Sequence, residues 1–189
     1  MRTRVRVATG LAVLAVLTVG NVPAEARIFA PTATQIRQDA SVALRGLYAK
    51  NPVAKLLGEK AKAMLIFPRI LKAGFIVGGQ GGDGALRKDG KTIRYYRTLA
   101  ASYGFQAGMQ AFGYVLFLMD DQALEYLDKS DGWEIGVGPS VVIVDKGVAS
   151  SLATTTLKDN VYAIIFDQKG LMAGIGIQGS KITRIHPRR

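Results

Sequence analysis

The sequence predicts an α+β fold: N-terminal amphipathic helices packed on a strongly bent, glycine-rich antiparallel sheet or barrel-like sheet with one inserted helix. Apolar residues at helical spacing come first, in residues 32–61, and strand-like stretches follow from residue 64 onwards. Runs of helix followed by runs of strand indicate an α+β fold. Glycines crowd residues 78–84 within apolar surroundings, and such glycines mark bends or places where another backbone comes close.

Residues 1–26 have the pattern of a secretory signal peptide. Arg2, Arg4 and Arg6 precede an uncharged stretch at residues 7–24, and Ala24-Glu25-Ala26 gives the small-x-small cleavage pattern. The apolar part is shorter than the roughly 20 residues of a spanning helix, which favours cleavage after Ala26 over an uncleaved anchor. We therefore expect a signal at 1–26, one domain at 27–189, and an exported or periplasmic protein.

Two helices are predicted next. Thr32 and Gln35 have the spacing of a capping box, and apolar residues recur at helical spacing from Ile36. Asn51 and Pro52 end this helix and begin another, because Asn caps helix N-termini and Pro suits the first helical position. We expect the apolar faces to pack on the sheet; the alternative is that part of one helix lies on a membrane surface.

The glycine-rich segment is predicted to form a bent hairpin. Pro68 interrupts the apolar run that precedes it, and Asp89-Gly90 is a hairpin turn signal. Further along, residues 112–119 and 161–166 are apolar throughout and are expected to be strands buried on both faces.

The remaining elements are shorter. Asp120 is expected to cap a helix that runs to Leu127, and residues 167–170 are expected to form a turn. Strands are predicted within 133–144, 171–178 and 181–185, giving six to nine in all, with Pro187 ending the ordered part.

The charge balance points to an anionic partner. The chain has 189 residues, 25 Lys plus Arg against 14 Asp plus Glu, and a net charge of +11. Without residues 1–26, which contribute three arginines and one glutamate, the charge is +9. Lipid head groups, nucleic acid or acidic polymers would suit this surplus, but export makes nucleic acid a poor choice. The absence of cysteine excludes disulfides, thiolate metal sites and a lipid-modified N-terminal cysteine.

Two glycine-containing stretches are similar in sequence to nucleotide-binding motifs, but neither meets the full requirements of its motif. Gly79, Gly81 and Gly84 fit G-x-G-x-x-G, but the segment runs into a hairpin and not into the helix that this motif requires. Gly90-Lys91-Thr92 is similar to the end of a phosphate-binding loop, yet Ala85 stands where that motif needs its first glycine.

The sequence offers no catalytic set, and we predict that the protein is not an enzyme and has no cofactor and no metal. His186 is the single histidine and lies near the end of the chain, so neither a metal site nor a Ser-His-Asp triad is expected. Asp120 and Asp121 are more simply explained as a helix cap than as paired carboxylates for acid–base chemistry.

What remains is binding through basic residues near the second helix and the hairpin. Basic groups beside aromatic ones such as Phe75, Tyr95 and Tyr96 suit the head-group level of an anionic membrane. The alternative is an ordinary solvated face of a basic protein. The candidate lipid-binding residues are Arg45, Lys55, Lys60, Lys62, Arg69, Lys72, Arg87, Lys88, Lys91 and Arg94.

Several stretches together resemble the SYLF domain family, over roughly residues 35–186. They are residues 63–68, 72–75 and 78–79, Tyr95-Tyr96, and residues 102–110, 132–134, 170–174 and 179–182. SYLF domains are lipid-binding modules, and the chain is identified as an exported, single-domain bacterial member. Eukaryotic members bind phosphoinositides and act at actin patches and endocytic membranes, helped by an N-terminal amphipathic segment that corresponds here to residues 45–72.

The resemblance implies lipid binding without a catalytic residue. A periplasm has no actin and ordinarily no phosphoinositides, so actin binding is not expected and the ligands would be acidic phospholipids or the lipid A region. The leading hypothesis is an exported protein that binds anionic lipid peripherally. The runner-up is a protein-interaction or structural role in the envelope without a lipid ligand, and an enzyme is a distant third.

Overall fold

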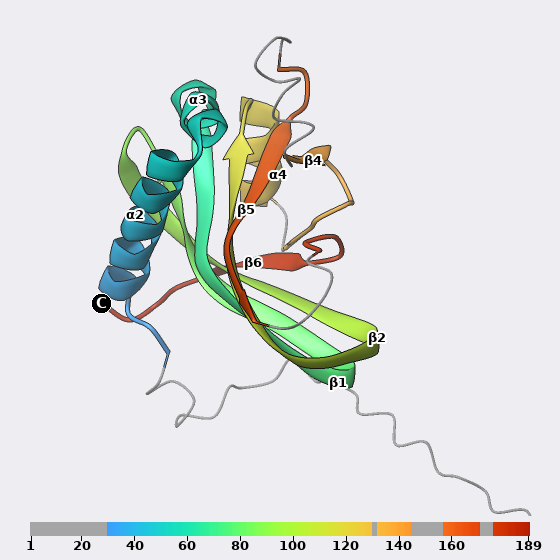
Figure 1. Ribbon diagram of the computed structural model, residues 1–189. Coiled ribbons are helices and arrows are strands. Elements are labelled where there is room, and N and C mark those ends of the chain that lie inside the picture. Colours follow the sequence, from blue (N-terminus) through green and yellow to red (C-terminus); the bar gives the residue numbers. More distant parts are fainter. Residues whose placement is uncertain (1–29, 130–131, 145–156, 171–175) are drawn as a thin grey trace, which may run out of the picture. The chain divides into compact units, whose positions relative to one another are not determined.

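The computed structural model describes residues 30–129, 132–144, 157–170 and 176–189, with the backbone alone at 75–76 and 102–107. Residues Pro31–Arg189 form one compact unit. In this unit two helices cover the outer surface of a strongly curled sheet, and a third helix packs against its inner surface (Figure 1). The α+β prediction is confirmed, whereas the predicted signal peptide lies outside the described residues.

The two N-terminal helices begin and end where the sequence predicts. Helix α2 (Ala33–Lys50) starts with the capping box: Thr32 Oγ1 accepts from the Gln35 amide at 3.2 Å, and Gln35 Oε1 accepts from the Thr32 amide at 2.8 Å. Asn51 Oδ1 accepts from the Ala54 amide at 3.0 Å and so caps helix α3 (Pro52–Lys60). Local hydrogen bonds alone define these boundaries.

One long hairpin forms the centre of the sheet. Strands β1 (Ala63–Lys88) and β2 (Lys91–Leu118) pair antiparallel along their whole length. The predicted turn is confirmed, with positive φ values of 50° at Asp89 and 74° at Gly90, as a type I′ turn requires. Pro68 does not end a strand but lies in a register shift between Phe67 and Ile70, where a missing amide costs no ladder hydrogen bond.

The hairpin is folded back on itself close to a second register shift, between Phe75 and Val77. A Cβ on Gly84 would lie 2.5 Å from the Ile66 carbonyl oxygen, and one on Gly82 would overlap the Arg69 carbonyl oxygen. The second half of β1 therefore touches its first half backbone to backbone. The predicted bend in the glycine-rich segment is confirmed, and the close approach explains why its glycines are needed.

The other strands attach to the two halves of β2. Its C-terminal half pairs with β5 (Val161–Gly170), and its N-terminal half pairs with β6 (Lys181–Ile185). Strand β3 (Trp133–Glu134) adds to β6, and β4 (Val141–Ile143) adds to β5. The β4–β5 pair is parallel, so the sheet formed by the six described strands is mixed and not wholly antiparallel.

The turn predicted at residues 167–170 is wrong. These residues belong to β5, where Lys169 pairs with Ala111. The turn-like signal comes from Asp167, whose φ is 49°, beside a register shift between Ala111 and Gly113 of β2. A bulge and a turn use the same backbone conformation, and long-range pairing decides between them.

Two apolar clusters hold the sheet between its helices. The inner cluster joins Leu65, Tyr114 and Leu86 of the hairpin with Trp133 and with helix α4 (Asp121–Lys129), which Asp120 caps as predicted. The outer cluster joins α2 and α3 to the opposite face of the sheet. Within the interior, the Tyr114 hydroxyl faces Thr98 from the other half of the hairpin, without a hydrogen bond of normal geometry.

We expect Gly84→Ala to destabilise residues 27–189 by about 3 kcal/mol, because its Cβ meets a backbone oxygen that cannot move freely. Gly46→Ala in α2 is the control: nothing lies within 4 Å of the added methyl group, and the change should stabilise the helix by up to about 1 kcal/mol. Urea unfolding followed by circular dichroism measures both, and equal stability of Gly84→Ala and wild type would contradict the proposed close approach.

Candidate functional site

The ten basic residues predicted as candidates lie in three places. One group is on or next to the helices, one flanks the hairpin turn, and one is in the first half of β1. The groups are Arg45, Lys55, Lys60 and Lys62; Arg87, Lys88, Lys91 and Arg94; and Arg69 and Lys72.

Lys72 does not belong to an exposed surface. Only 5% of it is accessible, and its pairing partner in β2, Gln110, is 7% accessible. Ile70, two residues earlier on the same face, is part of the inner cluster, so the Lys72 side chain points into the curl of the sheet. The sequence places Lys72 close to Arg69, and both are basic, so we predicted that they share a surface. In the strand, however, Arg69 is exposed and Lys72 points inward.

The structure brings the hairpin turn next to the junction of α2 and α3 (Figure 1). The Tyr48 hydroxyl donates to Met64 Sδ at 3.1 Å and lies against Gly58. Burial raises the pKa of Tyr48, the charge of Arg87 opposes this rise, and Glu59 adds to it. Arg87 of the hairpin and Glu59 of α3 therefore both lie near this tyrosine.

We call the resulting cationic region the α3–turn surface. Its lysines are exposed or half-buried, and they come from α3, from the α3–β1 connection and from either side of the hairpin turn: Lys55, Lys60, Lys62, Lys88 and Lys91. Glu59 and Asp89 also lie here and are exposed, so the surface is cationic but not uniformly so. Arg87 contributes less, because its Nη2 donates to the Gly90 carbonyl at 2.8 Å.

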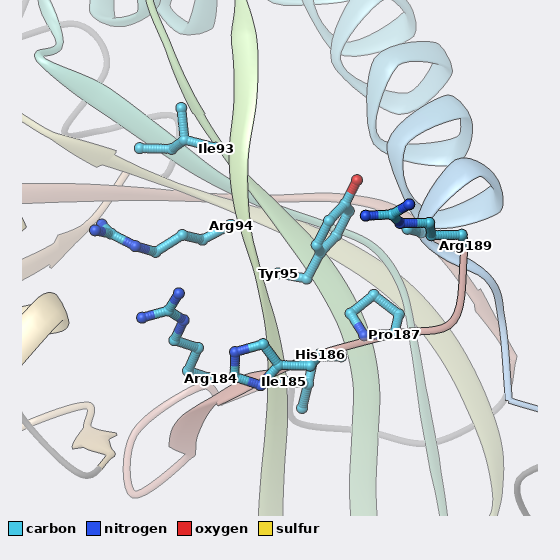
Figure 2. Close-up of a pocket in the computed structure, with 9 residues that line it drawn as sticks. Ile93, Arg94, Tyr95, Arg184, Ile185, His186, Pro187 and Arg189 are labelled. Atoms are coloured by element: carbon cyan, nitrogen blue, oxygen red, sulfur yellow. The ribbon is translucent and has the colours of Figure 1, made fainter.

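A groove of about 320 Å³ lies where β2, β6 and the C-terminal residues meet the start of α2. Figure 2 shows Arg94 and Arg184 extending to one side of the strand, with Tyr95 and Arg189 on the other side. The pairing of Tyr96 with Arg184 and of Tyr95 with Ile185 gives the same division between faces. The arginines therefore do not converge on one point, and the groove is not a cradle for a single anion.

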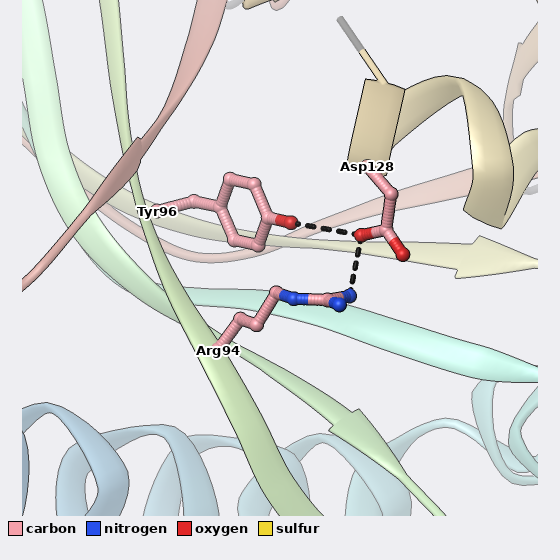
Figure 3. Close-up of polar contacts among 3 residues, drawn as sticks. All are labelled: Arg94, Tyr96 and Asp128. Carbon is pink, nitrogen blue, oxygen red and sulfur yellow. Dashed lines mark hydrogen bonds and ion pairs between the residues drawn. The ribbon is translucent and has the colours of Figure 1, made fainter.

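Arg94 is already engaged by an acidic side chain. It forms an ion pair with Asp128 of α4, which also accepts a hydrogen bond from the Tyr96 hydroxyl at 3.4 Å (Figure 3). Burial, and next the charge of Asp128, raise the pKa of Tyr96 to about 12, while Arg94 and Arg184 act in the opposite direction. The pair ties α4 to β2, so Arg94 serves the fold more than an external ligand.

Sequence reasoning missed the basic residues of the C-terminal tail. Arg184, His186 and Arg189 line the groove, and the Arg188 carbonyl accepts from the Ala33 amide at 2.7 Å. The prediction that order ends at Pro187 is therefore wrong. The sequence does contain a run rich in basic residues at 184–189. That this tail packs against the start of α2 could not be predicted, because it depends on a contact between the two ends of the domain.

The described part of the chain lacks two further features. Within it, no three His, Asp or Glu side chains gather as metal ligands would. None of its helices combines the length and apolar character needed to cross a membrane.

These features define an α+β domain built on one folded hairpin, with a cationic region at the turn end of that hairpin. Residues 99–186 match the Ysc84 family model, described as Las17-binding protein actin regulator. The match supports the SYLF resemblance for this part of the chain, which runs from the second part of β2 through β6. The resemblance seen in residues 35–98 lies outside the match. No curated protein matches the chain.

The raised pKa of Tyr96 predicts alkaline sensitivity. The folded state favours the neutral phenol, so this contribution to stability is complete below about pH 10, the ordinary tyrosine pKa, and is lost as the pH rises towards about 12. Tyr96→Phe should show a smaller fall in unfolding free energy over this range. Asp128→Asn should lower the pKa of Tyr96, as followed by phenolate absorbance, and an unchanged titration would contradict the proposed contact.

Proposed function

We propose that the protein is an exported, non-enzymatic lipid-binding protein that attaches peripherally to anionic phospholipid through the α3–turn surface. The family match over residues 99–186 supports a SYLF-type role. The pattern of residues 1–26 and the charge of +9 that remains without them support export and an anionic partner.

The observation that carries the proposal is the gathering of lysines from separate parts of the sequence. Lys55 and Lys60 lie on α3, while Lys88 and Lys91 flank the hairpin turn that packs beside the α2–α3 junction. Each Lys or Arg near an anionic membrane contributes about 1 kcal/mol. Several acting together give reversible attachment that weakens as salt screens the charges.

The expected ligand is defined by charge and compartment. Acidic phospholipids such as phosphatidylglycerol and cardiolipin, or the lipid A region, present the required phosphate groups at the surface of a bacterial membrane. The family description names Las17 binding and actin regulation. We do not extend either to this chain, because an exported protein would not meet actin.

An acidic envelope protein is the second candidate partner. The same exposed lysines of the α3–turn surface would meet its carboxylates. Such a partner would be recovered in complex with the protein, and vesicles would not compete for it.

We expect Lys55→Glu with Lys60→Glu to weaken binding of residues 27–189 to phosphatidylglycerol- or cardiolipin-rich vesicles by at least tenfold. The estimate follows from about 1 kcal/mol for each cation lost, with added repulsion from each new carboxylate. Co-sedimentation across a salt series measures the effect.

The matched control is Arg37→Glu with Lys129→Glu, which changes the net charge equally at the start of α2 and on α4. If both pairs weaken binding alike, only the total charge matters and the α3–turn surface is not the site. Absence of binding to anionic vesicles at low salt would reject the lipid function in favour of a protein partner.

A further inference from the structure

The usual polarity of a sheet is reversed at the folded end of the hairpin. We call this end the hairpin tip, comprising residues 71–81 of β1 and 99–110 of β2. Among its described side chains, four large apolar ones are exposed: Leu71 at 47%, Val77 at 64%, Leu99 at 57% and Met109 at 70%. The buried polar residues of the tip and of the strand beside it are Lys72, Thr98, Gln110 and Ser180.

Strand alternation establishes which side is which. Thr98 faces Tyr114 inside the curl, so Leu99, the next residue, points outward. Leu71 and Met109 each precede a buried polar residue and so lie on the outer face as well. On the inner side, the Gln80 amide nitrogen donates to the Gly176 carbonyl at 3.1 Å and to Ser180 Oγ at 3.3 Å, so Val77 points outward.

The expected polarity of the exposed strand face differs between a sheet in water and a sheet in hydrocarbon. In water the apolar side of a strand is buried and the polar side is exposed, whereas strands that face lipid turn apolar side chains outward and polar ones inward. Among the described residues, seven large apolar side chains are exposed, and four of them lie at the tip. Of the other three, Val42 lies on α2, Ile93 lies on β2 next to the hairpin turn, and Val137 lies between β3 and β4.

The distribution of these side chains favours a bilayer over a protein groove. Leu71 and Met109 lie on one half of the folded hairpin, and Val77 and Leu99 lie on the other half. Because the halves fold against each other, their outer faces point in different directions. A docking protein would cover one of these faces, whereas hydrocarbon would surround both.

Exposed cations lie beside the apolar side chains of the tip. Arg69 precedes Leu71 by two residues, Lys169 pairs with Ala111 beyond Met109, and Lys181 pairs with Leu99. Long basic side chains at the edge of an apolar insert reach the phosphate level of the membrane. Glu134 pairs with Lys181, and Asp167 lies two residues before Lys169, so acidic side chains are also present here.

We propose that the hairpin tip inserts into the hydrocarbon edge of a lipid bilayer, with Arg69, Lys169 and Lys181 at the head groups. This contact goes beyond the proposed function, because its partner is hydrocarbon and not surface charge. It also lies far from the α3–turn surface: the second half of β1, from Val77 to Lys88, spans roughly 35 Å at about 3.3 Å per residue. Figure 1 shows the tip projecting away from α2 and α3.

The first test is partition of residues 27–189 into neutral phosphatidylcholine vesicles at high salt, where the electrostatic attraction is absent. Wild type should bind, and Leu71→Ser with Met109→Ser should bind at least tenfold more weakly. The control pair, Val42→Ser with Val137→Ser, removes equally exposed apolar side chains elsewhere and should bind as wild type does. Circular dichroism confirms that each variant is folded.

A second measurement reports insertion directly. The single native tryptophan, Trp133, is 1% exposed and gives a constant background. A tryptophan introduced by Met109→Trp should shift to shorter emission wavelengths with vesicles and be quenched by brominated acyl chains. Val42→Trp on α2 should do neither.

Equal binding of the tip variants and wild type, or an unquenched Met109→Trp, would overturn the proposal. So would a tip-dependent dimer in sedimentation without vesicle binding, because the tip would then be an interface between copies of the chain. Salt-sensitive binding to anionic vesicles tests the proposed function separately, and either result can fail while the other stands.

Discussion

The contact on which the structure depends is the backbone-to-backbone approach within β1. Gly82 and Gly84 lie against the carbonyl groups of Arg69 and Ile66, so that the long hairpin can fold back on itself. This fold divides β2 into a half that pairs with β5 and a half that pairs with β6. A side chain at either glycine would separate the halves, and the inner cluster between them would lose its packing.

Folding the hairpin also gives the sheet two different environments. Near the open ends of the strands the interior is apolar, closed by α4 and Trp133, and the exterior is covered by α2 and α3. Towards the tip the helices no longer cover the sheet, and the interior becomes polar around Lys72 and Gln110. A single pair of strands thus passes from the conventional arrangement of a soluble protein to its reverse.

The two ends of the hairpin also differ in their surface charge and exposed apolar side chains. Lysines gather where the turn meets α3, whereas exposed apolar side chains gather at the opposite, folded end. Electrostatic attraction acts over about 10 Å and weakens with salt, while burial of apolar surface acts only at contact and tolerates salt. The two proposed contacts therefore differ in range and in their dependence on salt.

By itself the sequence determined the α+β class, both N-terminal helix boundaries and the Asp89-Gly90 turn, because the caps and the turn depend on bonds within a few residues. It also indicated the bend and a SYLF resemblance, which is confirmed over residues 99–186. Only the tertiary structure decided that Pro68 and Asp167 lie within strands and that Lys72 is buried. These outcomes depend on pairing partners tens of residues away, which local patterns do not contain.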